Sequence, residues 1–411
     1  MLLHKLLSTM MRRGRLAVVY AGGRVENYGD GSGPPVAVRL TKAGERRIAL
    51  NPSLGLGEAY MDGDLSFDQG DFFELMAIAG RNLTFRPEPP RSSLVRRVLI
   101  ALVRHMQEVN GRVAARENVH HHYDLSYELY SRFLDADMQY SCAYFAWPEM
   151  SLEEAQIAKK AHIAAKLALK PGMRVLDIGC GWGGLALTLA KDYGVQVCGV
   201  TLSTEQLAVA ERRAAEAGLS ERVHFSLTDY RDLKGPFDRI VSVGMFEHVG
   251  APNYRAFFGQ VRDLLTEDGV ALIHSIARAD PPAVTAPFIR KYIFPGGSIP
   301  ALSEVTTAVE DTGLWPTDIE LLRLHYAETL HCWRDRFVAD RAAIAAMYDE
   351  RFCRMWETYL AMSEISFRAG SHMVMQLQLA KRVDALPITR DYMYERERAA
   401  LAAKIEEHAR A

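Results

Sequence analysis

Between residues 151 and 276 the sequence alternates between apolar runs of strand length and longer segments with helical periodicity. The strand-like runs are RVLDIG, VQVCGV, RVHFSL, DRIVSVG and VALIHSI. Two capping-box signatures, Ser151-x-x-Glu154 and Ser203-x-x-Gln206, mark the starts of two intervening helices. Strands that alternate with helices of this length predict an α/β fold with a doubly wound, mostly parallel sheet.

The flanking segments predict further parts of the chain. Residues 1–88 hold the runs LAVVY, VAVRLT and RIAL between Gly-rich turns, followed by two helical patterns, and they predict a small N-terminal α/β domain. Residues 89–117 are interpreted as an Arg-rich linker and helix, residues 118–395 as the main domain, and residues 396–411 as a charged helical tail. Within the main domain, LLRLHY and VMQLQLA are candidate edge strands.

Charge and hydropathy limit the classes of partner. The formal net charge of -2 gives no general attraction for nucleic acid, so no nucleic-acid partner is expected. Basic residues cluster locally, and Arg96, Arg97 and Arg104 could face an anionic membrane surface, although a solvated basic face explains them equally well. No apolar run approaches the length needed to cross a bilayer, which predicts a soluble protein with at most peripheral membrane contact.

The cysteines and histidines do not predict a metal site. The five cysteines are odd in number and never spaced C-x-x-C, so a disulfide framework or zinc site is not expected and a reducing, cytoplasmic compartment fits. His120, His121 and His122 are consecutive, and three consecutive side chains do not face one site.

The Gly-rich stretch DIGCGWGG begins at Asp177, at the end of the first strand of the predicted sheet. The second strand ends in GVTLS, without the acidic residue that a nicotinamide cofactor's ribose would require. Acid-x-Gly-x-Gly-x-Gly instead resembles the S-adenosylmethionine loop of class I methyltransferases. A tight turn with a purely structural role is the alternative.

Several further motifs make the resemblance specific. HYDLSYELY, MQYSCAYF, LDIGCGWGG, TLSTEQ, DYRDL, FEHVG and LIHSI occur in the order and spacing of cyclopropane-fatty-acyl-phospholipid synthases and their mycolic-acid relatives. The resemblance covers residues 119–382 and implies methyl transfer from S-adenosylmethionine to a cis double bond of an unsaturated phospholipid acyl chain, followed by proton loss and ring closure. The carbocation on this route requires a dry, aromatic site and one base, which in the family is a bicarbonate ion.

The resemblance also implies the site residues. The bicarbonate cradle would be formed by Cys142, Glu247, His274, Ile276 and Tyr326. His274 and Tyr326 would donate hydrogen bonds, Ile276 would donate through its backbone amide, and Glu247 would accept from the bicarbonate hydroxyl. Cys142 would line the pocket; no adjacent histidine base marks it as a nucleophile. Ser363 stands where many members have a cysteine, so a covalent role at that position is excluded here.

The cofactor contacts carry over in the same way. The implied residues are Tyr140, Ser141, Asp177, Gly179, Cys180, Gly181, Gly183, Thr201, Leu202, Ser203, Gln206, Asp229 and Tyr230. For Gln206 a helix-capping role, and for Asp229 and Tyr230 a surface turn, are the structural alternatives.

The remaining expectations concern the lipid. The insertion at residues 277–300 is expected to cover the site as an acyl-chain lid lined by Tyr292 and Phe294, with Arg290 and Lys291 as weaker candidates for a phosphate headgroup; a structural excursion is the alternative. Residues 125–130 read LSYELY where many bacterial synthases have Gly-Asn, which leaves the chain preference open.

The last expectations concern membrane contact, oligomeric state and the rival functions. Peripheral contact at the inner face of the membrane and a possible homodimer supported by the N-terminal domain are inferred from similarity. The nearest rival is a homologue that makes methyl-branched or methylene lipids, and a small-molecule N- or O-methyltransferase is more distant.

Overall fold

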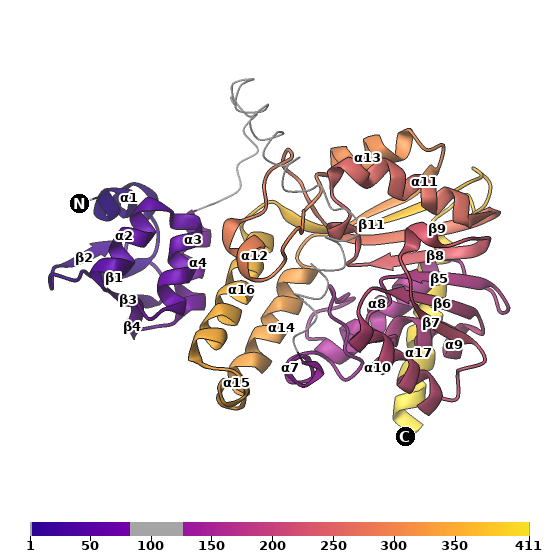
Figure 1. Cartoon of the computed structure of the whole chain (residues 1–411), viewed down its shortest axis with the longest axis horizontal. Helices are drawn as coiled ribbons and strands as arrows, with labels where there is room; N and C mark the ends of the chain where they lie inside the picture. Colours follow the sequence, from indigo (N-terminus) through magenta and orange to yellow (C-terminus); the bar gives the residue numbers. More distant parts are fainter. Residues whose placement is uncertain (1, 83–125, 411) are drawn as a thin grey trace. The chain divides into compact units, whose positions relative to one another are not determined.

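The computed structural model describes residues 2–82 and 126–410 (Figure 1). Contacts divide the chain into two units, each built from three segments. Unit 1 consists of Met1–Ser92, Thr285–Pro295 and Ala327–His372, and unit 2 of Ser93–Val284, Gly296–Tyr326 and Met373–Ala411. The domain boundaries expected at residues 88, 117 and 395 remain predictions, and residues 89–117 lie outside the described part of the chain.

Unit 2 contains the predicted doubly wound sheet. Its seven strands are β5 (Arg174–Ile178), β6 (Gln196–Thr201), β7 (Val223–Leu227), β8 (Phe237–Val243), β9 (Leu265–Arg278), β10 (Trp315–Leu322) and β11 (His372–Ala380). The strand order is β10-β11-β9-β8-β5-β6-β7. The pairs β5–β6, β6–β7, β5–β8 and β8–β9 are parallel, whereas β10 and β11 are antiparallel. The five strands predicted between residues 151 and 276 are therefore confirmed.

Helices cover both faces of this sheet. They are α7 (Tyr127–Ser131), α8 (Leu152–Lys166), α9 (Gly184–Tyr193), α10 (Thr204–Glu216), α11 (Tyr254–Leu264), α13 (Leu302–Glu310) and α17 (Asp391–Arg410). Ser151 begins α8 with the predicted capping box, and the Ser203 hydroxyl caps α10 by accepting from Gln206 N. Each cap satisfies backbone N–H groups that have no partner inside the helix.

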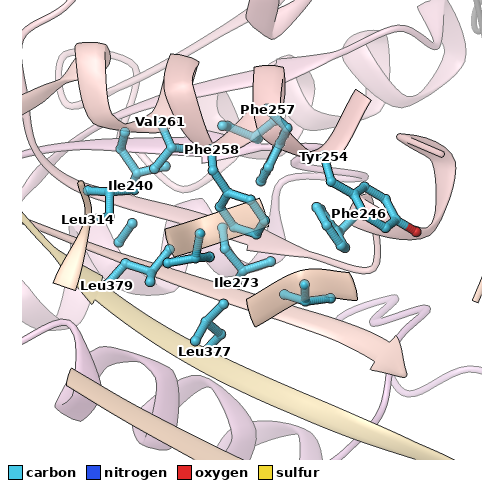
Figure 2. Packing of buried hydrophobic residues seen from close by; sticks show 14 of the residues in the cluster. Ile240, Phe246, Tyr254, Phe257, Phe258, Val261, Ile273, Leu314, Leu377 and Leu379 are labelled. Atoms are coloured by element: carbon cyan, nitrogen blue, oxygen red, sulfur yellow. The ribbon is translucent and has the colours of Figure 1, made fainter. Parts of the chain in front are cut away.

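Successive residues of the central strands point into two different cores. Ile240 and Ile273 pack with Phe257, Phe258 and Val261 of α11 on one face (Figure 2). Their neighbours in the chain pack on the other face in a second cluster with residues of α8 and α9. Both faces are apolar because a parallel sheet is covered by helices on each side.

Both predicted edge strands need correction. LLRLHY is not a strand: β10 ends at Leu322 and α14 (His325–Ala339) begins three residues later. VMQLQLA does belong to a strand, but β11 lies between β10 and β9 and β10 forms the edge. Its two glutamines, Gln376 and Gln378, are buried and make hydrogen bonds inside the unit.

Unit 1 contains a second, smaller sheet with the order β2-β1-β3-β4. Its N-terminal elements are α1 (Leu2–Met10), β1 (Arg15–Val19), β2 (Val25–Tyr28), β3 (Pro35–Leu40), α2 (Lys42–Leu50), α3 (Pro52–Met61), β4 (Leu65–Gln69) and α4 (Phe72–Asn82). The run RIAL, expected as a strand, is the end of α2. Thr41 caps this helix by accepting from Gly44 N, and Ile48 is buried.

Three later helices complete unit 1 together with most of α14: α12 (Pro287–Tyr292), α15 (Arg341–Met347) and α16 (Glu350–Arg368). The Glu58 carboxylate of α3 accepts hydrogen bonds from Lys291 (2.6 Å) and Tyr292 (2.8 Å) of α12. A Cβ at Gly57 would lie 2.5 Å from the Phe288 ring. The N-terminal segment therefore packs closely against part of the predicted lid. Within the described residues, no helix is long and apolar enough to cross a membrane.

Candidate active site

The Gly-rich loop leaves the end of β5 and turns directly into α9. Gly179, Gly181 and Gly183 have φ angles of 83°, 54° and 82°, which is the left-handed region that favours glycine. A Cβ at Gly183 would lie 2.7 Å from Phe225 Cζ. The sequence pattern is therefore required both by the turn and by close packing.

A cavity of about 340 Å³ lies beside this loop. Eleven of the thirteen predicted cofactor residues line it: Tyr140, Ser141, Asp177, Gly179, Cys180, Gly181, Thr201, Leu202, Gln206, Asp229 and Tyr230. Gly183 and Ser203 do not line it, because Gly183 closes the turn and Ser203 caps α10. The cavity lies at the carboxyl ends of parallel strands, where doubly wound sheets bind ligands.

Asp177 is buried beneath the loop, and neither of its carboxyl oxygens has a hydrogen-bond partner among the described residues. Burial raises the pKa of Asp177 to about 7, although the nearby Lys159 ammonium acts in the opposite direction. A buried acceptor without a donor is costly, so this carboxyl group fits a ligand that donates hydrogen bonds.

Helix α8 holds the segment that carries Tyr140 and Ser141. Lys159 Nζ donates to Gln139 Oε1 (2.7 Å) and to Ser141 Oγ (2.8 Å), and Gln156 Nε2 donates to the Ser141 carbonyl (3.0 Å). Burial lowers the pKa of Lys159 to about 8. This wall of the cavity is therefore fixed by buried polar groups.

The far wall contains Asp229 and Tyr230. The Asp229 carboxylate accepts from Arg231 Nε (2.8 Å) and Nη2 (2.5 Å). Its contact with the cofactor stays a prediction, and Arg231 lines the same cavity as Asp229.

None of the five predicted cradle residues lines this cavity. Glu247 nevertheless lies in the chain between Met245 and His248, which both do. Its Oε1 accepts from Ile276 N (2.6 Å), and its Oε2 is buried without a partner in the part of the chain that the structure describes. Burial raises the pKa of Glu247 to about 7, although the hydrogen bond from the Ile276 amide acts in the opposite direction. The Ile276 amide, expected to donate to bicarbonate, thus donates to Glu247.

His274 of β9 supplies a buried nitrogen. Its Nδ1 lies 3.1 Å from Gln376 Nε2, and its Nε2 is buried without a partner among the described residues. Burial holds the pKa of His274 well below its ordinary value, so the ring is neutral. In this orientation of the Gln376 amide its NH₂ group faces Nδ1, so Nδ1 accepts and Nε2 carries the proton. His274 is therefore ready to donate one hydrogen bond.

The other two cradle residues lie in short segments of unit 2. Cys142 is buried and its Sγ lies 3.3 Å from the Ala143 carbonyl oxygen, while Tyr326 is the second residue of α14. The assembly of all five residues into one cradle stays a prediction.

A family model described as mycolic acid cyclopropane synthetase matches residues 111–377. The chain belongs to this family. A second model, a domain of unknown function (DUF7884), matches residues 2–84.

The relatives of this cyclopropane synthetase family member include characterised enzymes. The chain is 41% identical over 341 residues to the cyclopropane-fatty-acyl-phospholipid synthase of Escherichia coli K12, covering 82% of this chain and 86% of that protein. It is 37% identical over 370 residues to the tuberculostearic acid methyltransferase UfaA1 of Mycobacterium tuberculosis, covering 86% and 85%.

Solved structures agree with the fold. The cyclopropane synthase MmaA2 of M. tuberculosis is 36% identical, with a TM-score of 0.62 over 65% of this chain and 98% of its own. A coclaurine N-methyltransferase at 21% identity has a TM-score of 0.65, covering 79% of this chain and 99% of its own, and supports the class I methyltransferase fold alone.

Sequence reasoning missed several residues of this family member's site. Lys159 and Gln156 were not among the predicted site residues, because their role depends on the loop that folds against α8. Gln376 was absent because its contact with His274 spans 102 residues. A signal was available: polar residues spaced three and four apart on α8 fall among buried alanines.

Other predicted residues have a defined place without a tested role. Phe294 packs edge-on against Tyr359, with 5.9 Å between the ring centres. The Tyr292 hydroxyl donates a hydrogen bond to the Glu58 carboxylate, and both contacts lie within unit 1. The lid role stays a prediction. Arg96, Arg97, Arg104 and the His120–122 run lie outside the described residues. Among the described residues, no group of His, Cys, Asp and Glu could hold a metal ion.

Proposed function

We propose that this chain is a cyclopropane-fatty-acyl-phospholipid synthase that uses S-adenosylmethionine to convert cis double bonds of phospholipid acyl chains into cyclopropane rings. The observation that carries the proposal is that two buried atoms, the acceptor Glu247 Oε2 and the donor His274 Nε2, each lack a partner in the described part of the chain. Such a pair suits a small ion with both a hydroxyl and bare oxygens. The 41% identity to the E. coli synthase supports the same reading.

The residues present fit S-adenosylmethionine. This cofactor supplies an electrophilic methyl group on a sulfonium. The positive-φ glycines let the backbone approach the ligand closely, and the partnerless Asp177 carboxyl group offers acceptors for its donors. Lys159 holds Ser141, one of the cofactor contacts that the resemblance implies.

The residues also fit a bicarbonate ion, which would supply the base. Glu247 would accept from its hydroxyl, and the neutral His274 would donate from Nε2. Gln376 keeps His274 in the tautomer with the proton on Nε2. Ile276 serves indirectly, because its amide orients Glu247. The predicted contacts of Cys142 and Tyr326 complete the cradle.

The reaction places two demands on the chain. The alkene π electrons form the new C–C bond as the C–S bond breaks and S-adenosylhomocysteine leaves. The resulting cation then loses a proton from the new methyl group, and that C–H electron pair closes the ring. The chain must exclude water around this cation and hold a proton acceptor at the methyl carbon. The burial of the Glu247 carboxyl group and of His274 serves the first demand, and the bicarbonate ion that they would hold would serve the second.

A lipid substrate implies contact with a membrane. We propose a cytoplasmic enzyme that docks peripherally on an anionic leaflet, with the N-terminal segment assisting in docking or in a homodimer. Residues 285–295 would help to cover the acyl chain.

A direct test incubates the purified chain with vesicles of cis-monounsaturated phospholipid, S-adenosylmethionine and defined bicarbonate, followed by analysis of the released acyl chains. The proposal expects a product that gains one CH₂ unit, survives mild hydrogenation and depends on bicarbonate. Unchanged lipid would contradict it. A product that takes up hydrogen would point to a methylene lipid.

The second candidate is a methyltransferase that leaves a methyl branch. It is favoured by the 37% identity to the tuberculostearic acid methyltransferase and by 40% identity over 289 residues to a probable fatty acid methyltransferase of Pseudomonas putida, which covers 68% of this chain and 73% of that protein. The two activities share the cation. Loss of a proton from the new methyl group closes the ring, whereas loss of a proton from a neighbouring chain carbon leaves a methyl-branched alkene.

A further inference from the structure

A cluster of buried charges surrounds His162 of α8, which follows Lys159 by three residues. His162 is 2% exposed. Its Nδ1 lies 2.8 Å from Glu397 Oε2 of α17, and its Nε2 lies 2.7 Å from Glu320 Oε2 of β10. An imidazole whose two nitrogens both meet carboxylates donates from both, so the ring is cationic. Burial alone lowers the pKa of His162, but the two hydrogen bonds outweigh burial and raise it above its ordinary value.

The surrounding groups balance this charge. Lys166 donates to Glu320 and lies 3.7 Å from Asp318, which also pairs with Arg390 at 3.0 Å. Tyr144 is close to both glutamates and to Tyr394, and Glu320, Lys166 and His162 also act on His274. With His162 protonated, three cations face three carboxylates. A neutral His162 would leave an excess buried negative charge, which is strongly unfavourable.

A stack of rings connects this cluster to another part of unit 2. The Tyr144 ring lies 4.1 Å from the His162 ring at 10° and 5.1 Å from the His325 ring at 2°. His325 Nδ1 also accepts from Phe145 N at 3.0 Å. A cationic ring against an aromatic face is favourable, so the charge on His162 strengthens the stack. The stack joins α8, the loop before it and the start of α14.

Two predicted cradle residues lie next to the stack in sequence. Cys142 precedes Tyr144 by two residues, and Tyr326 directly follows His325. We infer that His162 is a positioning residue, which through Tyr144 and His325 holds the segments of Cys142 and Tyr326 in register for anion binding. This inference rests on the proposed function. His162 does not touch the reacting atoms in this account.

The test compares His162→Gln and Tyr144→Leu, which break the stack, with Tyr144→Phe, which keeps the ring. Leu314→Ala is a stability control, because Leu314 belongs to the separate hydrophobic cluster of Figure 2. Three quantities are measured: the bicarbonate concentration for half-maximal activity, the rise in Tm when bicarbonate replaces chloride, and the affinity for S-adenosylhomocysteine.

We expect both stack-breaking variants to need about tenfold more bicarbonate and to lose most of the Tm rise. Tyr144→Phe and Leu314→Ala should keep both responses, and S-adenosylhomocysteine affinity should change less than about threefold in all four variants. If the wild-type chain responds to bicarbonate and Tyr144→Leu keeps the same response, this inference is overturned while the proposed function stands. A wild-type chain that makes cyclopropane lipid without any bicarbonate response overturns the inference and the proposed base, and one that makes no lipid product overturns the proposed function with it.

Discussion

At the scale of single residues, the site is defined by buried polar atoms for which the described part of the chain supplies no partner. Asp177 and Glu247 both have a pKa raised to about 7 by burial, and His274 is held neutral. Shifted pKa values cluster at functional sites, because burial that destabilises the charged group in the empty site also tunes that group for its ligand or reaction. The two carboxyl groups therefore stabilise the ligand-free fold least when they are ionised.

Asp177→Asn should reveal this through the pH dependence of stability. A folded-state pKa of about 7, above the unfolded value of about 3.9, gives a contribution to stability that is lost as pH rises between those values. Relative to wild type, the ligand-free variant should gain about 2–3 kcal/mol between pH 5 and pH 8. Urea unfolding at both pH values measures it, and a pH-independent difference would contradict the raised pKa.

Glu247→Gln tests the acceptor directly. The amide keeps the size of the side chain but cannot reproduce the carboxylate, so we expect the rate of lipid product formation to fall about hundredfold or more. Calorimetry should find the affinity for S-adenosylhomocysteine unchanged, because Glu247 does not line the cofactor cavity. Full activity in this variant would remove Glu247 from the mechanism.

Only some of the site residues could be predicted from the sequence. The glycines and Asp177 were predictable because they form a continuous motif on one loop. Gln376, Lys159 and His162 were not, because each acts on a residue distant in the chain through a contact that only the folded sheet creates. The Ile276 amide was assigned to the ion, although its nearest acceptor is Glu247.

At the scale of elements, the turn from β5 into α9 unites backbone geometry with cofactor binding. Gly183 begins the helix at a left-handed φ and packs against Phe225 and Ala210. Strand assignments were predictable where apolar runs were continuous, as in β5 to β9. The strand assignment of VMQLQLA was also right, but its edge position was wrong, and the assignments failed at LLRLHY, where β10 ends and α14 begins, and at RIAL, where the cap at Thr41 decides for a helix.

Gly183→Ala and Gly172→Ala separate the two demands on this turn. Both glycines have φ of 82°, so both variants should lose about 1–2 kcal/mol of stability. Only at Gly183 does a Cβ also meet a ring at 2.7 Å, whereas nothing lies within 4 Å at Gly172. Gly183→Ala should therefore be the less stable variant and bind S-adenosylhomocysteine more weakly, and equal Tm and affinity in the two variants would contradict the packing argument.

At the scale of the whole molecule, chain segments far apart in sequence form each unit. Unit 1 combines the N-terminal sheet with α12 and α16, and Gly57 lies where α3 approaches both. No local pattern announced this grouping, because the sequence suggested consecutive domains. The matched family model for residues 2–84 covers only the N-terminal part of the unit.

Gly57→Ala should destabilise unit 1. The added Cβ would lie 2.5 Å from the Phe288 ring and 2.9 Å from Thr358 Cγ2, so overpacking should cost about 1–3 kcal/mol. Gly22→Ala, where nothing lies within 4 Å, is the matched control and should stay within about 0.5 kcal/mol of wild type. Thermal unfolding of both variants checks this, and equal stability would show that α3 and α12 do not pack this closely.

The central claim is that the chain closes a ring on a lipid double bond. The measurement that tests it most directly is mass spectrometry of phospholipid acyl chains after incubation with the purified protein and S-adenosylmethionine carrying a CD₃ group. The account predicts a product heavier by CD₂ that resists hydrogenation, because one methyl deuteron is lost as the ring closes. A product that keeps CD₃ as a branch, or label that enters no lipid, would contradict it.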